Sequence, residues 1–232
     1  MDKQELLNKI KGKLIVSCQA RVGWPMYGPE IMAAFALAAK QGGAAAIRAT
    51  GPDNLLAIKQ KVDLPIMGIN KIFLDGYDVY ITPTYESAKA ILDVGIDIIC
   101  MDATLRKRPN DEKVIDIITR IKKEYPDVIT VGEISTLDEA KAILDYGFDF
   151  ISTTLAGFTK ESSNVKHMDL DLIKEIKKIS DIEVIAEGRI HTPKDAVSAL
   201  EAGAFCVVVG TAITRPEILT QNFVEAINLR QE

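Results

Sequence analysis

The chain has 232 residues, of which 47% are hydrophobic and 26% are charged, and its formal net charge is −5. This composition is that of a globular protein with a large core, and it excludes a disordered, collagen-like or coiled-coil chain. The acidic balance argues against a nucleic-acid partner, which would need a basic stripe on the protein. No segment approaches the length of apolar chain that a membrane span requires, so we expect no membrane partner.

The three cysteines, Cys18, Cys100 and Cys206, are far apart, and each lies in an apolar run. Their number and positions predict buried, reduced thiols. The first 13 residues are mixed and charged, without the apolar stretch of a signal peptide. Together these features predict a cytoplasmic protein.

Short β-branched runs alternate with amphipathic segments along the whole chain. The predicted strands are Leu14–Cys18, Ala44–Ile47, Pro65–Ile69, Ile96–Met101, Val128–Val131, Phe148–Thr153, Ile182–Ala186 and Phe205–Val209. The predicted helices are Pro29–Gln41, Asn54–Lys61, Tyr85–Val94, Lys113–Tyr125, Leu137–Tyr146, Leu170–Ile179, Lys194–Ala202 and Glu217–Leu229. Apolar strands that alternate with helices are typical of a parallel sheet covered on both faces.

The predicted helix ends carry local signals. Thr136 to Glu139 form a capping box, and Thr192-Pro193 places proline in the first helical turn. A glycine closes each of three helices just before the next strand, where a left-handed residue is favoured: Gly95, Gly147 and Gly203. The helix–glycine–strand segment AKAILDVGIDII at 88–99 reappears as AKAILDYGFDFI at 140–151, so one structural unit is reused.

Eight strand–helix units in 232 residues leave 29 residues for each unit, close to the minimum for a (β/α)₈ barrel. The alternative, an open doubly wound sheet, usually has a glycine-rich dinucleotide turn after its first strand, and SCQARVGWPMYG at 17–28 has none. We therefore predict an α/β protein that is a single (β/α)₈ TIM barrel over 1–232, with a short N-terminal extension, 1–13.

Active sites of such barrels lie at the carboxyl ends of the strands. Seven of the eight predicted strands end in ionisable or strongly hydrogen-bonding residues. In chain order, the residues at the strand ends are Gln19, Arg48, Asn70-Lys71, Asp102, Glu133, Thr153-Thr154, Glu187-Gly188-Arg189 and Gly210-Thr211, with Arg215 beyond. A ring of ion pairs that stabilises the barrel mouth is the alternative, and it stays open for Asp102 and Gln19.

The last two predicted strands each end in a glycine before a helix, in the segments AEGRI and VVGTAITRP. Backbone amides at such positions bind phosphate, and barrels often build a phosphate site there. We expect phosphate-binding roles for Gly188, Arg189, Gly210, Thr211 and Arg215.

Lys71, Glu133 and Glu187 are then expected around the reacting carbons of a small phosphorylated substrate. A partly desolvated lysine acts as a general base or as a Schiff-base amine. The set suits proton abstraction beside a carbonyl, with Arg48 or Gln19 steadying the enolate.

No metal or cofactor is expected. The two histidines, His167 and His191, are not spaced as metal ligands, and neither a nucleophile elbow nor a P-loop is present. Trp24 and Tyr27, in the loop after the first strand, are expected either to anchor that loop by packing or to cap the site.

Several segments together resemble the N-acylglucosamine-6-phosphate 2-epimerase family, also called N-acetylmannosamine-6-phosphate 2-epimerases. The resemblance extends from about Leu14 to Val224. Its motifs are LIVSCQA (14–20), GGAAAIRA (42–49), LPIMGINK (64–71), DVYITPT (78–84), MDATLRKRP (101–109), IAEGRI (185–190) and VVGTAITRP (208–216).

The resemblance implies a barrel, usually a homodimer, that needs neither metal nor organic cofactor. It implies interconversion of N-acetylmannosamine 6-phosphate and N-acetylglucosamine 6-phosphate, two phosphorylated amino sugars, in sialic acid breakdown. In this family Lys71 corresponds to the base at carbon 2, Glu187 to a residue assisting proton transfer and ring opening, and Arg215 to a contact near the phosphate. Substrate contacts are expected from Gln19, Arg48, Asp102, Glu133 and Thr153.

The chain departs from the family pattern near the site. Glu133 stands where the family commonly has aspartate, Arg189 where it often has asparagine, and Thr211 where it often has a second glycine. Ala156 replaces a residue that is often polar. Two other functions remain as alternatives: a Schiff-base aldolase acting through Lys71, and a barrel that binds a sugar phosphate without turnover.

Overall fold

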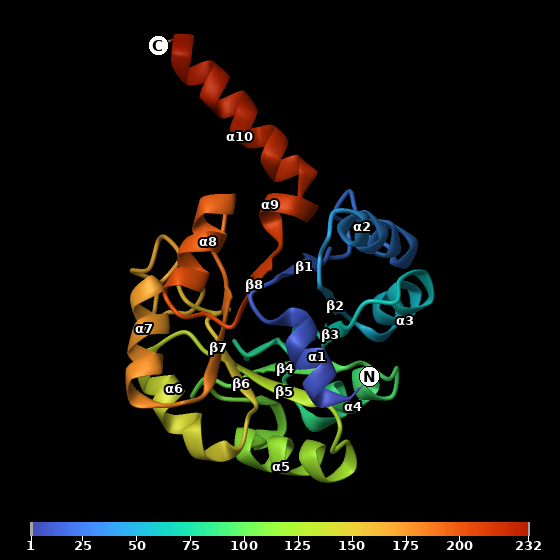
Figure 1. The fold of residues 1–232 in the computed structure, drawn as a ribbon, viewed down its shortest axis with the longest axis vertical. Helices are drawn as coiled ribbons and strands as arrows, with labels where there is room; N and C mark the ends of the chain where they lie inside the picture. The colour runs from blue at the N-terminus through green and yellow to red at the C-terminus, as the bar shows by residue number, and fades with distance from the viewer. Residues whose placement is uncertain (1, 232) are drawn as a thin grey trace.

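A closed barrel of eight parallel strands forms the centre of the computed structural model, which describes residues 2–231 (Figure 1). The strands follow one another around the barrel in chain order, and β8 pairs with β1. They are β1 (Leu14–Cys18), β2 (Ala46–Thr50), β3 (Ile66–Ile69), β4 (Ile98–Asp102), β5 (Ile129–Glu133), β6 (Phe150–Ser152), β7 (Glu183–Glu187) and β8 (Cys206–Val209). The predicted (β/α)₈ barrel is confirmed, and the open sheet is wrong. Residues 1 and 232 of the predicted domain lie outside the described residues.

Helices surround the barrel and alternate with its strands (Figure 1). The α-helices are α1 (Lys3–Ile10), α2 (Pro29–Gln41), α3 (Pro52–Lys61), α4 (Tyr85–Leu92), α5 (Val114–Glu124), α6 (Leu137–Ile143), α7 (Leu170–Ile179), α8 (Pro193–Glu201), α9 (Thr211–Thr214) and α10 (Pro216–Asn228). Short 3₁₀ turns are η1 (Pro109–Asp111), η2 (Leu144–Tyr146) and η3 (Leu229–Gln231). Within the described residues, no helix is long and apolar enough to cross a membrane.

The segment expected only as an N-terminal extension contains a helix, α1. Its apolar residues Leu6 and Ile10 are buried and join the cluster inside the barrel. The amide of Gly12 donates to the carbonyl of Phe205, which ties the end of this segment to the residue before β8. Helix α1 therefore closes the amino end of the barrel, opposite the face where the active site is expected.

Alternation along the strands divides the core into two layers. In β2, Ala46 belongs to the cluster inside the barrel, whereas Ile47 and Ala49 pack against the helices. Successive side chains of a strand point to opposite faces. Arg48 therefore points toward the barrel axis, and the same argument holds for Glu133, two residues after Val131 of the inner cluster. Strand periodicity thus directs charged side chains into the mouth of the barrel.

The local signals at the helix ends are also confirmed. Both Thr136 and Thr192 form capping boxes with the third residue of their helices. Gly95, Gly147 and Gly203 have positive φ angles of 77°, 86° and 104°, as predicted for residues that end a helix. The three cysteines are free and buried, as predicted.

Helix α10 differs from the other long helices because it leaves the barrel. Figure 1 shows it projecting from α9 into solvent, away from the strands. None of its residues is buried, and the exposed fractions of Phe223 and Ile227 are 73% and 57%. The sequence predicts this helix almost residue for residue, but it does not predict that the helix lies apart from the barrel.

Candidate active site

A cavity of about 420 Å³ opens at the carboxyl ends of the strands. Residues from the ends of β1, β2, β3, β7 and β8 line it, together with the loops that follow. The predicted site residues in its lining are Gln19, Arg48, Lys71, Glu187, Gly188, Arg189, Gly210, Thr211 and Arg215. The structure therefore brings most of the predicted site together at one end of the barrel.

Arg48 lies at the base of this cavity between two carboxylates. Its side chain is only 2% exposed, and it pairs with Glu133 at 2.5 Å and with Glu187 at 3.0 Å. Burial by itself would lower the pKa of Arg48, but attraction to Glu187 and Glu133 outweighs burial and raises that pKa. A buried guanidinium is tolerated only with such partners. Arg48 Nε and Glu133 Oε2 have no hydrogen-bond partner among the described residues.

Lys71 lies just after β3. Its backbone amide donates to Thr50 Oγ1, and an antiparallel bridge links it to Ile81. Its Nζ has no hydrogen-bond or ion-pair partner among residues 2–231. Burial, followed by the positive charge of Arg48, lowers the pKa of Lys71 from 10.5 to about 8, although Glu133 and Glu187 oppose this. A neutral amine is therefore accessible near neutral pH, as a general base requires.

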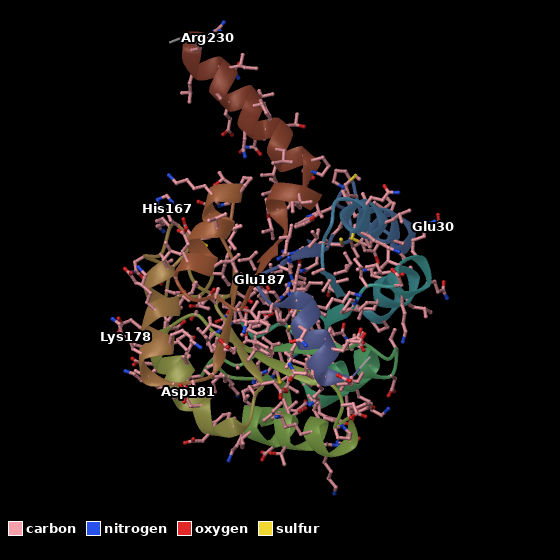
Figure 2. The ribbon with its side chains drawn as sticks, viewed as in Figure 1. Glu30, His167, Lys178, Asp181, Glu187 and Arg230 are labelled. Carbon is pink, nitrogen blue, oxygen red and sulfur yellow. The ribbon has the colours of Figure 1, made fainter. Side chains whose placement is uncertain are left out.

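Glu187, the last residue of β7, is the carboxylate that lines the cavity. Figure 2 shows it at the centre of the barrel, whereas Lys178 lies on an outer helix. One of its oxygens pairs with Arg48, and the other accepts a hydrogen bond from Thr154 at 3.2 Å. Burial raises the pKa of Glu187 to about 7; the charge of Glu133 adds to this effect, and Arg48 and Lys71 oppose it. Glu187 can thus both hold and release a proton near neutral pH.

Glycines shape the other end of the cavity, after β7 and β8. A Cβ at Gly188, whose φ is +99°, would lie 3.2 Å from the carbonyl oxygen of Thr154. Gly210 precedes α9, and a Cβ there would lie 3.3 Å from Ser17 Cβ. Both positions leave backbone amides near the cavity without covering side chains. Thr211 lines the cavity beside Gly210.

Two arginines flank this glycine-lined end. Arg215 forms an ion pair with Glu217, and its guanidinium lies 3.7 Å from the centre of the Trp24 ring. Arg189 has a positive φ of 56° and donates to the carbonyls of Gly157 and Lys166. Arg189 is thus bonded largely to the loop after β6, although it still lines the cavity.

Three predicted substrate contacts lie behind the cavity wall. Asp102 is fully buried and is held by Thr104 and Arg106. Glu133, also fully buried, faces Arg48. Thr153 is buried and donates through its hydroxyl to the carbonyl of Glu187. Direct substrate contact by these three residues stays a prediction.

Gln19 is placed in the cavity wall. Its side-chain amide donates to Ser17 Oγ at 2.6 Å, and its Oε1 has no partner among the described residues. Trp24 lines the cavity as well, whereas Tyr27 is not in its lining. Capping of the site by Trp24 stays a prediction.

Several lining residues were not predicted from the sequence: Ser17, Arg21, Tyr80, Ile81, Leu155, Phe158, Ile190, Val208 and Thr214. Thr154 was noted only as a strand-end residue, although it lines the cavity and bonds Glu187. Strand alternation offered a signal for Ser17, because it lies two residues before Gln19. Arg21 follows β1 in an irregular loop, where periodicity gives no signal.

Among residues 2–231, no three His, Cys, Asp or Glu side chains are grouped as metal ligands. His191 lines the cavity, whereas Figure 2 shows His167 at the outer edge of the molecule. The absence of a metal or a cofactor remains a prediction.

Comparisons with known proteins identify close relatives over nearly the whole chain. Residues 32–229 match the family described as "Putative N-acetylmannosamine-6-phosphate epimerase". Two curated relatives are described as N-acetylmannosamine-6-phosphate 2-epimerases, with the same qualifier. The protein from Caldanaerobacter subterraneus subsp. tengcongensis is 44% identical over 98% of this chain and 96% of its own length. The protein from Shouchella clausii is 46% identical over 96% of this chain and 98% of its own length.

Two solved structures are also similar to this chain. The N-acetylmannosamine-6-phosphate 2-epimerase from Clostridium perfringens superimposes with a TM-score of 0.92 and 43% identity, over 95% of this chain and 96% of its own. A thiamine phosphate pyrophosphorylase from Pyrococcus furiosus superimposes with a TM-score of 0.60 over 90% of this chain and 89% of its own. At 19% identity, the second similarity concerns the fold alone.

Proposed function

We infer, from the premise that this chain belongs to the N-acetylmannosamine-6-phosphate epimerase family, that it interconverts N-acetylmannosamine 6-phosphate and N-acetylglucosamine 6-phosphate. It is a carbohydrate 2-epimerase, an isomerase of amino sugar metabolism. The observation that carries the mechanism is the Lys71 amine in the cavity wall. It has no partner among the described residues, and its pKa is lowered to about 8.

The reaction begins with opening of the sugar ring, because the hydrogen on carbon 2 is acidic only beside a free aldehyde. We assign ring opening to Glu187: its carboxylate accepts the proton of the hydroxyl group on carbon 1 and passes it to the ring oxygen, and a pKa of about 7 suits both steps. The bond from Glu187 to Thr154 and its pair with Arg48 support this role, because they fix both carboxylate oxygens.

Lys71 then accepts the proton from carbon 2. The electron pair of the C–H bond forms the enolate, whose negative charge lies on the aldehyde oxygen. We assign stabilisation of that oxygen to Arg48 and Gln19, because both residues line the same cavity as Lys71. Return of a proton to the opposite face of carbon 2 completes the epimerisation.

The source of the returning proton has two candidates, Lys71 itself and a carboxyl group, Glu187 or Glu133. Reaction in D₂O separates them. If Lys71 acts alone, part of the original hydrogen returns to the product in a single turnover. If a separate carboxylic acid delivers the proton, the product acquires deuterium from the first turnover.

We place the substrate phosphate between the ends of β7 and β8. The backbone of Gly188 and Gly210 approaches this end of the cavity closely, and Thr211 and Arg215 lie beside it. Arg189 also lines this end, but its bonds to Gly157 and Lys166 support an indirect role, in which it holds the loop after β6 in place.

Proton NMR of N-acetylmannosamine 6-phosphate in D₂O tests the proposed function. Loss of the carbon-2 hydrogen signal, with growth of the gluco epimer, is the expected result. An unchanged spectrum with folded protein would refute the substrate assignment. Borohydride trapping is the parallel test of the aldolase, since an epimerase gives no covalent adduct.

A homodimer is part of this proposal, and α10 supports it. The helix carries the exposed apolar residues Phe223, Val224 and Ile227, and it projects away from its own barrel (Figure 1). An exposed apolar stripe on a helix of this kind is typically buried against another protein surface. We propose that this surface belongs to a second copy of the chain, against which α10 packs.

The oligomeric state tests this assignment directly. Light scattering after gel filtration is expected to give a dimer for the wild type and a monomer for Phe223→Asp. Gln221→Asp, on the same helix, is the control and should remain a dimer. A monomeric wild type would refute the assignment. We also place the enzyme in the cytoplasm, a location supported by three buried cysteines that form no disulfide.

A further inference from the structure

Arg21 lines the cavity from the loop after β1. Its guanidinium carbon is 4.9 Å from the centre of the Phe73 ring and 5.4 Å from that of Trp24. Contacts of this kind attract a cation to an aromatic face. The guanidinium is therefore held in one region above the cavity, although it belongs to an exposed loop.

Phe73 and Trp24 in turn contact residues at the two ends of the site, near the proposed base and near the proposed phosphate position. On one side, Phe73 stacks on Tyr80 at 4.9 Å, and Lys71 Nζ lies 5.8 Å from the Tyr80 ring. On the other side, the guanidinium carbon of Arg215 lies 3.7 Å from the centre of the Trp24 ring. Arg21 thus occupies the middle of a chain of contacts from the proposed base to the proposed phosphate end.

The order of the strands around the barrel independently places Arg21 between these two ends. β1 lies between β8, which leads to Arg215, and β2, which neighbours the strand leading to Lys71. A substrate that spans these two ends passes below the loop that follows β1. The cavity lining includes Arg21 together with both ends.

The donors of Arg21 are free, unlike those of the other arginines in the lining. Arg48 is paired with two carboxylates, Arg215 with Glu217, and Arg189 with two backbone carbonyls. Within residues 2–231, Arg21 has neither an ion pair nor a side-chain hydrogen bond. A guanidinium on a cavity wall with all its N–H groups free can bind oxygen atoms of a ligand.

We propose that Arg21 is a further substrate-binding residue, held on Trp24 and Phe73, that donates hydrogen bonds to the oxygen atoms of the sugar phosphate between its reacting carbon and its phosphate. The inference rests on the proposed function, because it takes the substrate of that function as the ligand. It adds a contact from above the cavity to the contacts from the strand ends below.

The charge of Arg21 has a second consequence at Lys71. Lys71 is surrounded by Arg48, Glu133 and Glu187 from the strands and by Arg21 from the loop. The positive charge of Arg21 is one of the causes that lower the pKa of Lys71. Removing that charge should move the lysine toward its ordinary value.

Steady-state kinetics of three variants test the proposal. Arg21→Met removes the donors and the charge but keeps the apolar stem, and Arg21→Lys keeps the charge. Arg120→Met is the matched control, because Arg120 also lies over an aromatic ring, that of Tyr85, but on α5 outside the cavity. Circular dichroism and thermal unfolding verify that each variant is folded.

The expected result for Arg21→Met is a KM raised roughly ten- to hundredfold, the loss typical of hydrogen bonds from a charged donor. The acid limb of the kcat/KM profile should also move to higher pH. Arg21→Lys should recover part of the KM and keep the wild-type pH profile. Arg120→Met should match the wild type in both. A KM for Arg21→Met within about twofold of the wild type would overturn the proposal.

Binding without turnover provides a second measurement. Trp24 is the only tryptophan of the chain, so its fluorescence reports on the cavity directly. In a Lys71→Ala background, N-acetylglucosamine 6-phosphate should change that emission, and adding Arg21→Met should weaken the measured affinity. Equal affinities with and without Arg21 would refute the contact, whereas wild-type turnover checks the proposed function separately.

Discussion

The pH dependence of kcat/KM is the most direct test of Lys71 as a neutral base. With a pKa of about 8 instead of 10.5, the unprotonated fraction of Lys71 at pH 7 is about one in ten. An ordinary lysine would be unprotonated in only about one molecule in three thousand at that pH. We therefore expect kcat/KM to rise about tenfold from pH 7 to a plateau above about pH 9.

The assay is the initial rate at substrate concentrations well below KM, because kcat/KM reports the ionisation of the free enzyme. Measurements begin at pH 7, since the substrate phosphate titrates at about pH 6. Samples returned from each pH to pH 8 control for irreversible inactivation. A flat profile, or a midpoint near 10.5, would refute the assignment of a perturbed neutral Lys71.

The charged neighbours of Lys71 should move the midpoint in opposite directions. Glu187 raises the pKa of Lys71, so Glu187→Gln should shift the acid limb to lower pH while it reduces kcat. Arg21 lowers that pKa, so Arg21→Met should shift the limb to higher pH. Shifts in the same direction for both variants would contradict this account of the charges around the base.

Three further changes have defined outcomes. Lys71→Ala should lower kcat by about 10²–10⁴-fold, and a variant within about threefold of the wild type would remove Lys71 from the role of base. Arg48→Met leaves two buried carboxylates without their cation and should destabilise the protein by about 3–5 kcal/mol, measured by urea unfolding; an unchanged midpoint would contradict the burial argument. Gly157→Ala should lower the melting temperature by more than about 4 °C, because φ is +79° and the new Cβ would lie 2.4 Å from the Val165 carbonyl oxygen. Gly23→Ala, with φ +85° but no atom within 4 Å, is its control and should cost less.

The barrel itself was predictable because its signals are local. Apolar strands, helix caps and closing glycines are each read from a few neighbouring residues, and their regular alternation leaves few topologies. The predicted second strand, however, stopped at Ile47, one residue before a charge. The strand continues to Thr50 because Glu133 and Glu187, far away in the sequence, compensate the buried Arg48. Such partners cannot be recognised from local sequence.

The same limitation explains why some predicted contacts lie outside the cavity lining. Asp102 ends a buried strand, as a site residue would, but its oxygens are held by Thr104 and Arg106 of its own loop. At the end of β6 the sequence singled out Thr153 for the substrate, whereas Thr154 lines the cavity. A one-residue uncertainty in where a strand ends reverses which side chain faces the site. Helix α10 was predicted as a helix, but its position depends on contacts beyond its own sequence.

The cavity also explains how a chain of net charge −5 accepts an anionic substrate. Its lining contains five cationic side chains, Arg21, Arg48, Lys71, Arg189 and Arg215, but a single carboxylate, Glu187. Three of these side chains show how the positive charges are accommodated. Arg48 is neutralised by carboxylates, Lys71 is made less basic by burial, and Arg21 rests on aromatic rings. The unneutralised charge is therefore concentrated above the cavity and near its glycine-lined end, where it attracts a phosphate without protonating the base below.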